Sequence, residues 1–396
     1  MILRPYQSDA VSAILADISV AGNSIVSLPT GAGKSLIIAE CAARLNQPVL
    51  IVTPSKEIVV QDAEKMSLYV GADKIGIYSA SLSSKKINTF TFATIQSIYR
   101  KPEDFAHFKI VFIDECDLLD PREMDTMFRS FLSSIGNPKV IGFSATAYRL
   151  SHNYDRKRNL VTSIKMINRI KTRGARGFVM FWDRIIFNLD PEYLIERGFL
   201  IRPTYYFNKL LDNKDIPINK SKTDFDLEKY QELITSREDS ILDAVRRAKE
   251  KFRSILVFCA SVEQAERFAE TVKDSAALSS KTKAKDRDRI IKDFKSGTLR
   301  IVFNYTVLGV GFDYPALDCV VLVRPTRSLR LYYQFVGRAI RPATGKTQTT
   351  VIDFSDTVKT LGRIETIRLV KNAGLWNIQT ERGLWHGKTL YSFKIL

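Results

Sequence analysis

The most informative stretch of the sequence is Leu28-Pro29-Thr30-Gly31-Ala32-Gly33-Lys34-Ser35. It lies between a β-branched run and a helix-forming segment. Glycines let such a backbone curl so that successive N–H groups face an anion at the positive end of the next helix. Lys34 would reach the β- and γ-phosphates of a nucleotide, and Ser35 would ligate Mg²⁺. The strict pattern begins with glycine where this chain has leucine, so only the shorter form is matched. The residues expected to cradle the phosphates are Thr30, Gly31 and Gly33.

A second stretch complements the first. Ile110-Val111-Phe112-Ile113-Asp114-Glu115-Cys116-Asp117 is an apolar strand that delivers two carboxylates at its polar end. Asp114 would hold Mg²⁺ through water, and Glu115 would position and deprotonate an attacking water. Acidic residues at the end of a strand often have no function beyond facing the solvent where the strand leaves the sheet. Downstream of a phosphate loop, however, the pair predicts hydrolysis of ATP with Mg²⁺ as cofactor.

Strands and helices alternate around these two stretches. Alternation of this kind indicates an α/β fold with a mostly parallel sheet and helices on both faces. The expected strands of the first half are 24–28, 49–53, 74–78, 89–94, 110–113 and 140–143, and the helices are 6–18, 35–44 and 55–69. A second block of the same style has expected strands at 201–207, 254–258, 300–303, 319–323 and 349–353, with helices at 227–251, 262–273 and 286–295.

The 396 residues therefore predict two related parallel-sheet domains in tandem. We expect a first domain over 1–148, a basic and aromatic insertion with linker over 149–200, a second domain over 201–357 and a tail over 358–396. The tail has helical character after Phe354, and its role is not assigned.

Positive charge is concentrated in the second part of the chain. Residues 1–146 carry 14 Lys/Arg and 15 Asp/Glu, whereas residues 147–396 carry 46 and 28. Arg149–Gly177 holds nine basic residues against the single acid Asp155, and Phe178, Phe181 and Trp182 follow. A bias of this kind is typical of a polyanion-binding surface. The cations would contact nucleic acid, with Arg169, Lys171 and Arg173 as candidates, whereas the aromatics would either form a strand-separating wedge or pack in the core.

With these motifs the chain resembles the superfamily 2 helicases and translocases of the DEAD/DEAH type, from about residue 1 to 355. The resemblance implies two RecA-like domains that bind ATP and nucleic acid. Leu3-Arg4-Pro5-Tyr6-Gln7 is similar to their adenine-reading motif, and Asp114–Asp117 is similar to their second motif in the form DECD. The other implied roles are adenine contact by Arg4 and Gln7, strand contact by Thr53, Pro54, Thr94, Gln96, Ser261 and Thr306, coupling of ATP to nucleic acid by Ser144 and Thr146, and nucleotide contact by Gly311 and Asp313.

The last motif of the resemblance is Gln334-Phe335-Val336-Gly337-Arg338-Ala339-Ile340-Arg341. Two arginines three residues apart on a helix project from the same face. The resemblance implies that Arg338 and Arg341 act on the γ-phosphate, with Gln334 in the catalytic set. Guanidinium groups suit the charge that spreads over phosphoryl oxygens during transfer.

Within the superfamily the chain looks most like the DNA-directed members, namely the UvsW-type, RecG-type and Rad25-like branch-migration helicases. The features behind this likeness are the opening L-R-P-Y-Q, the DEC sequence and Arg324-Pro325-Thr326. We therefore expect ATP-driven unwinding or branch migration of forked or branched DNA in recombination, replication or repair, in a phage-encoded or minimal bacterial protein. Two alternatives stay open: an RNA helicase, and the motor subunit of a restriction or defence complex.

Composition excludes several other classes. No run of about eighteen apolar residues is present, so we expect no membrane partner. The opening residues lack a signal-peptide pattern, and the four cysteines show no C-x-x-C spacing. We expect a cytoplasmic monomer of a bacterial or phage-infected cell.

Overall fold

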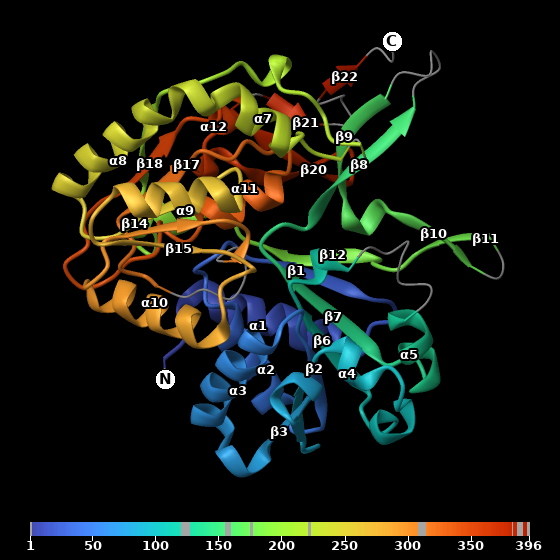
Figure 1. Cartoon of the computed structure of the whole chain (residues 1–396). Helices are drawn as coiled ribbons and strands as arrows, with labels where there is room; N and C mark the ends of the chain where they lie inside the picture. Colours follow the sequence, from blue (N-terminus) through green and yellow to red (C-terminus); the bar gives the residue numbers. More distant parts are fainter. Residues whose placement is uncertain are drawn as a thin grey trace. The chain divides into compact units, whose positions relative to one another are not determined.

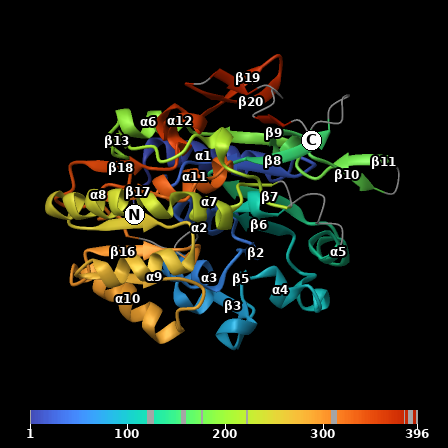
Figure 2. The same ribbon diagram turned by 45° about the horizontal axis from the view of Figure 1, so that its top comes forward.

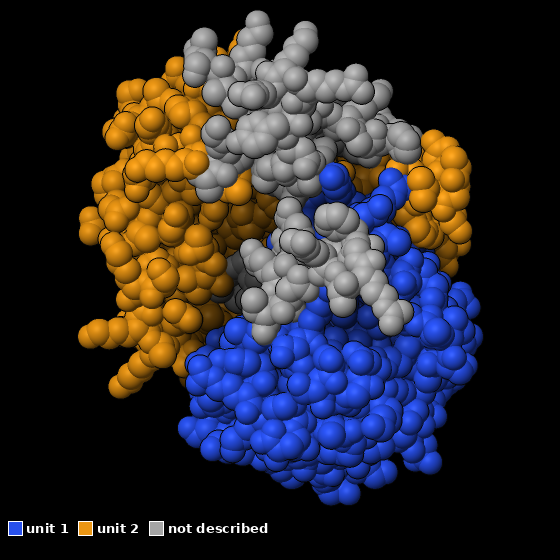
Figure 3. Space-filling model, turned by 90° about the vertical axis from the view of Figure 1, so that its right-hand side faces the viewer, with its two compact units in different colours: residues 1–149, 165–189 blue, residues 150–164, 190–396 orange. Residues whose placement is uncertain are grey.

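A computed structural model describes residues 2–119, 127–154, 160–174, 177–220, 223–307, 314–381, 383–385 and 391–393. The chain divides into two compact units, drawn in blue and orange in Figure 3. Unit 1 comprises residues 1–149 and 165–189, and unit 2 comprises 150–164 and 190–396. The segment 149–200, which we expected to form an insertion and linker, is thus shared between the two units.

Unit 1 is built on a mostly parallel sheet (Figure 1). Among its described residues the strands pair in the order β12-β1-β7-β6-β2-β5-β3-β4, and only the β3–β4 pair is antiparallel. Central strands of such sheets are covered on both faces, which explains why runs such as Val49–Val52 are apolar throughout. The bounds are β1 (Ser24–Ser27), β2 (Val49–Val52), β3 (Ile75–Ser79), β4 (Ser84–Lys85), β5 (Phe90–Ala93), β6 (Ile110–Asp114), β7 (Lys139–Ser144) and β12 (Arg184–Asn188).

Three helices of unit 1, α1 to α3, begin within one residue of the predicted positions, whereas α4 and α5 were not predicted. Pro5 occupies the first position of α1, which suits its missing N–H. Ser55 caps α3, its Oγ accepting a hydrogen bond from the Ile58 N–H. Helix α1 packs against α2, and α2 against α3. The bounds are α1 (Pro5–Asp17), α2 (Lys34–Leu45), α3 (Lys56–Val70), α4 (Ile95–Ile98) and α5 (Phe128–Ser134).

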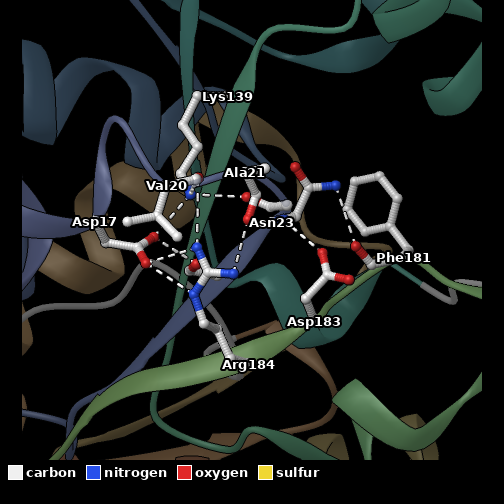
Figure 4. A network of polar contacts seen from close by, with 10 residues as sticks. Asp17, Val20, Ala21, Asn23, Lys139, Phe181, Asp183 and Arg184 are labelled. Atoms are coloured by element: carbon white, nitrogen blue, oxygen red, sulfur yellow. Dashed lines mark hydrogen bonds and ion pairs between the residues drawn. The ribbon is translucent and has the colours of Figure 1, made fainter.

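The edge strand β12 was not predicted, and a polar network ties it to the start of β1 (Figure 4). The carboxylate of Asp17 is buried and accepts from Lys139 at 2.8 Å and from Arg184 at 2.7 Å. Burial alone would raise the pKa of Asp17, but these cations and Ser24 hold it below its ordinary value. Asp183 next to Arg184 accepts the Asn23 N–H at 2.6 Å. Residues 165–189 therefore return to unit 1 and complete its sheet. A separate three-stranded sheet has β9 (Leu160–Met166) in its centre, between β8 (Tyr148–Tyr154) and β22 (Tyr391–Phe393).

Unit 2 contains a second parallel sheet. Its described strands pair in the order β13-β18-β17-β14-β16-β15, and every pair is parallel. The strands are β13 (Pro203–Phe207), β14 (Ile255–Phe258), β15 (Ser275–Leu278), β16 (Ile301–Asn304), β17 (Cys319–Leu322) and β18 (Thr349–Asp353). The helices are α6 (Pro191–Glu196), α7 (Leu227–Ile234), α8 (Glu238–Lys251), α9 (Val262–Thr271), α10 (Ala284–Ser296), α11 (Leu329–Val336) and α12 (Thr357–Leu361). The two sheets confirm the α/β fold with parallel-sheet domains.

One expectation for unit 2 was wrong. The single helix expected over 227–251 is interrupted by a 3₁₀ turn over Thr235–Arg237. Thr235 donates its hydroxyl hydrogen to the carbonyl of Gln231, and this local bonding weakens a continuous helix. Glu238 opens α8 and accepts hydrogen bonds from Gln264 and Arg267 of α9. This tertiary contact fixes where the second helix starts.

The helical character expected for the tail is found only at its start, in α12, because the described residues beyond 367 are mostly in strands. Strands β19 (Arg368–Asn372) and β20 (Leu375–Thr380) form an antiparallel hairpin, seen in red at the top of Figure 2, and β21 (Gly383–Trp385) pairs with β20. Ala373 and Gly374 both have positive φ, as the tightest hairpin turn requires. Alanine is an unusual residue at that position, so the turn gave no signal in the sequence.

Among the described residues, no helix is both long and apolar enough to cross a membrane.

Gly142 in β7 generates a stability prediction. A Cβ at this position would lie 2.5 Å from the Trp182 ring and 2.7 Å from the Cys116 sulfur, both fully buried. Gly142→Ala should therefore lower the free energy of unfolding by about 1–3 kcal/mol, as overpacking does. Denaturant unfolding measures the loss, and in Gly142→Ala/Trp182→Phe the two costs should be less than additive. A Gly142→Ala protein as stable as the parent would contradict this packing.

Candidate functional site

The phosphate loop follows β1 and opens α2, as predicted. Gly31 and Gly33 both have positive φ, at 91° and 83°. A Cβ on Gly33 would also lie 2.5 Å from the Gln7 amide nitrogen, so glycine is required there for space as well as conformation. The loop thus has the curled backbone and the helix N-terminus that an anion site needs.

Lys34, the first residue of α2, is largely but not fully buried, with its side chain 13% exposed, and it contacts the carboxylates at the end of β6. Its ammonium lies 3.2 Å from Asp114 Oδ1 and donates a short hydrogen bond to Glu115 Oε1. Burial by itself would lower the pKa of Lys34, but Asp114 and Glu115 raise it above its ordinary value. Burial raises the pKa of Asp114 to about 7, against the opposing effect of Lys34. The structure therefore brings together the three residues predicted to act on the γ-phosphate, Mg²⁺ and water.

Ser35 contacts a residue that the sequence analysis missed. Its Oγ donates to Asp62 Oδ1 of α3 at 2.6 Å. Asp62 falls on the buried stripe of α3, whose other members are Ile58, Val59, Ala63 and Met66. An acid in an apolar helical stripe is the signal that could have found it.

The residues present fit Mg²⁺ held mainly through phosphate and water. No group of three or more His, Cys, Asp or Glu side chains arranged to hold a metal occurs in the part of the chain that the structure describes. Mg²⁺ bound with a nucleotide usually takes only one or two protein ligands. The Ser35 hydroxyl and the Asp114 carboxylate are oxygen donors of that type, and a second buried carboxylate, Asp62, lies beside Ser35.

The residues expected to read adenine lie against the phosphate loop. Gln7 is buried; its Nε2 donates to the Ala32 carbonyl at 3.0 Å, and its Oε1 accepts the Arg4 N–H at 2.9 Å. The Tyr6 hydroxyl donates to the same Ala32 carbonyl, and Arg4 donates to Tyr6. This cluster links the start of α1 to the loop.

The residues expected to couple the ATP site to nucleic acid contact Asp117 directly. The Asp117 carboxylate accepts from Ser144 Oγ at 2.5 Å and from Thr146 Oγ1 at 2.9 Å, and all three are buried. Arg149 donates to the Asp117 carbonyl at 3.1 Å. The end of β6 is therefore bonded to the loop after β7 by side chains.

The expected strand-contacting residues of unit 1 differ in accessibility. Thr53 is buried and donates to the Ser55 carbonyl, while Thr94 is buried and bonds to Ser97. Pro54 is half-buried, and Gln96 at the start of α4 is exposed. Gln96 is thus the residue of this set with an open side chain.

In unit 2, Gln334 lies near the end of α11, and Arg338 and Arg341 follow it. Lys346 donates to the carbonyls of Ala339, Arg341 and Pro315, the last two at 2.9 and 3.0 Å. Burial lowers the pKa of Lys346 to about 8, a direction that Arg341 reinforces and Asp318 opposes. One ammonium thus fixes the turn that carries Arg338 and Arg341.

The other expected residues of unit 2 are partly described. Ser261 caps α9, where its Oγ accepts the Gln264 N–H at 3.0 Å. Thr306 is exposed with a positive φ of 63°. Gly311 and Asp313 lie outside the described residues.

The basic segment has a defined backbone but few described side chains. Lys171–Gly174 (β10) and Gly177–Met180 (β11) form a two-stranded antiparallel sheet. Arg169 is half-buried and Lys171 is exposed, while the Arg173 side chain lies outside the described residues. Phe181 and Trp182 are buried and pack edge-to-face at 4.8 Å, which supports the core alternative for these two rings.

Two family models match the chain. The model described as "Type III restriction enzyme, res subunit" matches residues 1–149, and "Helicase conserved C-terminal domain" matches residues 236–343. The first covers the phosphate loop and the DECD motif, and the second covers Gln334, Arg338 and Arg341.

Curated relatives and solved structures agree with these models. The chain is 25% identical to IRC3 of Saccharomyces cerevisiae, named as a candidate ATP-dependent helicase, over 89% of this chain and 51% of that one. It therefore spans about half the length of that relative. The DNA 3'-5' translocase XPB2 of Sulfurisphaera tokodaii is 24% identical over 86% of this chain and 78% of its own length.

A fragment of a candidate HsdR subunit of a type I restriction enzyme from Vibrio vulnificus has the same fold. Its TM-score is 0.66 at 19% identity, and the match covers 92% of this chain and 67% of that one. From the two family models and these relatives we conclude that the chain belongs to superfamily 2 of the helicases.

Proposed function

We propose that the protein is an ATP-dependent DNA helicase or translocase that unwinds or branch-migrates forked or branched DNA. The observation that carries the ATP-dependent part is the cluster of Lys34, Asp114 and Glu115 at the phosphate loop. The DNA preference is supported by the excess of positive charge after residue 146 and by the resemblance to the DNA translocase XPB2. Recombination, replication and repair are the processes in which such substrates arise.

In this proposal, each candidate site residue at the phosphate loop and at the end of β6 has a role in ATP hydrolysis. Lys34 exchanges its carboxylate partners for the β- and γ-phosphate oxygens. Glu115, released from Lys34, orients a water and accepts its proton as that water attacks the γ-phosphorus. Ser35 directly and Asp114 through water would hold Mg²⁺, which when bound would supply positive charge next to the phosphates. Thr30, Gly31 and Gly33 offer backbone N–H groups, while Arg4 and Gln7 contact the adenine.

Residues of unit 2 complete the proposed machinery. Arg338 and Arg341 stabilise the charge on the departing phosphoryl group, with Gln334 beside them, and Gly311 and Asp313 contact the nucleotide. Fixed guanidinium groups are suited to that task. The Lys346 contacts support this role, because they hold the arginine-bearing turn in one conformation.

Nucleic acid is proposed to contact both units. The candidate contacts are Thr53, Pro54, Thr94, Gln96, Arg169, Lys171, Arg173, Ser261 and Thr306. At Thr53 and Thr94 the side chains are buried, and the Thr53 N–H already donates to the Ala93 carbonyl, so the exposed Gln96 offers the open side chain in this part of unit 1. Basic side chains bind the phosphates, and base reading is not required.

The first prediction tests the function itself. The wild-type protein should open a labelled fork, a Holliday junction and a displacement loop only with ATP and Mg²⁺. Lys34→Ala and Glu115→Gln should each lower turnover by at least about 100-fold, since they remove a phosphate ligand and the base. The exposed Lys109→Ala is the matched control and should behave as wild type. Unwinding and ATP hydrolysis are measured on the same samples.

Three results would contradict the proposal in different parts. Undiminished unwinding by both variants would exclude the ATP site. Faster opening of an RNA duplex than of the matched DNA would favour an RNA helicase. Good ATP hydrolysis with unwinding that appears only when a partner protein is added would favour the motor subunit of a larger complex.

The second prediction concerns coupling through Asp117. Ser144→Ala/Thr146→Val removes both hydroxyl donors to the buried Asp117 carboxylate. Unwinding should fall about tenfold while DNA-stimulated ATP turnover changes less than about threefold, a coupling loss of the expected size. Ser12→Ala, which removes an exposed hydroxyl of α1, is the control. Equal losses of turnover and unwinding would assign these hydroxyls to the chemical step instead.

The third prediction concerns the basic segment. Charge reversal at Arg169, Lys171 and Arg173 should weaken DNA binding and flatten its dependence on salt, by about one unit of slope for each phosphate that is no longer neutralised. The control reverses three exposed cations elsewhere in unit 1, at Lys65, Lys74 and Lys109. Binding isotherms at several salt concentrations measure both quantities. An unchanged slope would place the DNA-binding surface elsewhere.

A further inference from the structure

Asp62 is a buried acid, and only one of its two carboxylate oxygens has a hydrogen-bond partner among the described residues. Its side chain is 6% exposed, and Oδ1 accepts from Ser35 Oγ at 2.6 Å. Oδ2 is buried without a hydrogen-bond partner among the described residues. A carboxylate oxygen taken out of water without a partner costs free energy, so such atoms are rare in folded proteins and usually have a functional reason.

The surroundings of Asp62 carry an excess of negative charge. Three carboxylates, those of Asp62, Asp114 and Glu115, lie near the single buried ammonium of Lys34. Lys65, one turn along α3, offsets part of the charge from the exposed surface. The pocket therefore favours an additional cation beside Ser35.

A structural role alone does not explain the carboxylate. Anchoring the Ser35 hydroxyl needs one acceptor oxygen, which asparagine would supply without the cost of a buried charge. The charge is useful only when a cation is present. Ser35 is the residue that the sequence pattern assigns to Mg²⁺.

We propose that Asp62 is a positioning residue for the Mg²⁺ of the nucleotide. By accepting the hydrogen bond from the Ser35 hydroxyl it leaves the Oγ lone pairs free for the metal, and its charge strengthens binding of the hydrated cation. Partners that hold a metal ligand from behind raise the ligand's basicity and the affinity for the metal. This inference rests on the proposed nucleotide site, since Ser35 must face bound phosphates.

The test measures metal dependence rather than turnover. Binding of a fluorescent ADP analogue is titrated with Mg²⁺, and Mn²⁺ binding to the ADP complex is followed by electron paramagnetic resonance. Asp62→Asn should raise the half-saturating Mg²⁺ concentration about tenfold, the loss typical of such partners, and leave ADP affinity without metal unchanged. Asp62→Ala should raise it at least as much. Glu64→Gln, which removes an exposed charge from the same helix, should match the wild type.

The outcomes separate this inference from the proposed function. Identical metal titrations for Asp62→Asn, Glu64→Gln and wild type would overturn the role of Asp62 while leaving the nucleotide site intact. Failure of the wild type to bind ADP at any metal concentration would overturn the proposed function and this inference with it. Thermal unfolding is measured alongside. Since Asp62→Asn removes a buried charge, its melting temperature should not fall, and a reduced melting temperature with unchanged metal dependence would identify Asp62 as purely structural.

Discussion

Unit 1 depends on the contact between the Lys34 ammonium and the carboxylates of Asp114 and Glu115. These two carboxylates at the end of β6 hold the ammonium, and a third lies nearby on α3. Without a nucleotide, removal of Lys34 would leave these carboxylates without their shared cation, and a buried charge without compensation costs several kcal/mol. The charged contact is therefore both a structural tie between α2 and β6 and the component that phosphate oxygens would replace.

The same strand end links this contact to the rest of unit 1. Asp114 and Glu115 contact Lys34, while Asp117, a few residues on, holds Ser144 and Thr146. The carboxylates that would release Lys34 are therefore close in sequence to Asp117, whose hydrogen bonds fix the loop after β7. In unit 2, Lys346 donates to the Arg341 carbonyl and so fixes the turn that carries Arg338 and Arg341. In both units, side-chain hydrogen bonds thus hold the loops that carry the candidate site residues.

The features that could be predicted from the sequence are those set by residues close together along the chain. The phosphate loop, the DECD strand and the helix starts depend on neighbouring residues, and the structure places Lys34, Asp114 and Glu115 together as expected. Asp62 was missed because its partner Ser35 is far away in sequence and only packing of α3 on α2 brings them together. The return of β12 was missed for the same reason, since Asp17, Lys139 and Arg184 come from three distant segments. The hairpin turn at Ala373 was missed because its residue type is unusual there.

The central claim is that nucleotide at Lys34 and nucleic acid on the same chain are energetically coupled. The most direct measurement is a linked titration, in which forked-DNA affinity is determined across concentrations of a non-hydrolysable ATP analogue with Mg²⁺, and analogue affinity across DNA concentrations. Two ligands coupled through one protein must change each other's dissociation constants by the same factor. The account predicts a common factor of about 5–150, the usual range of such coupling. Two dissociation constants that each ignore the other ligand would contradict it.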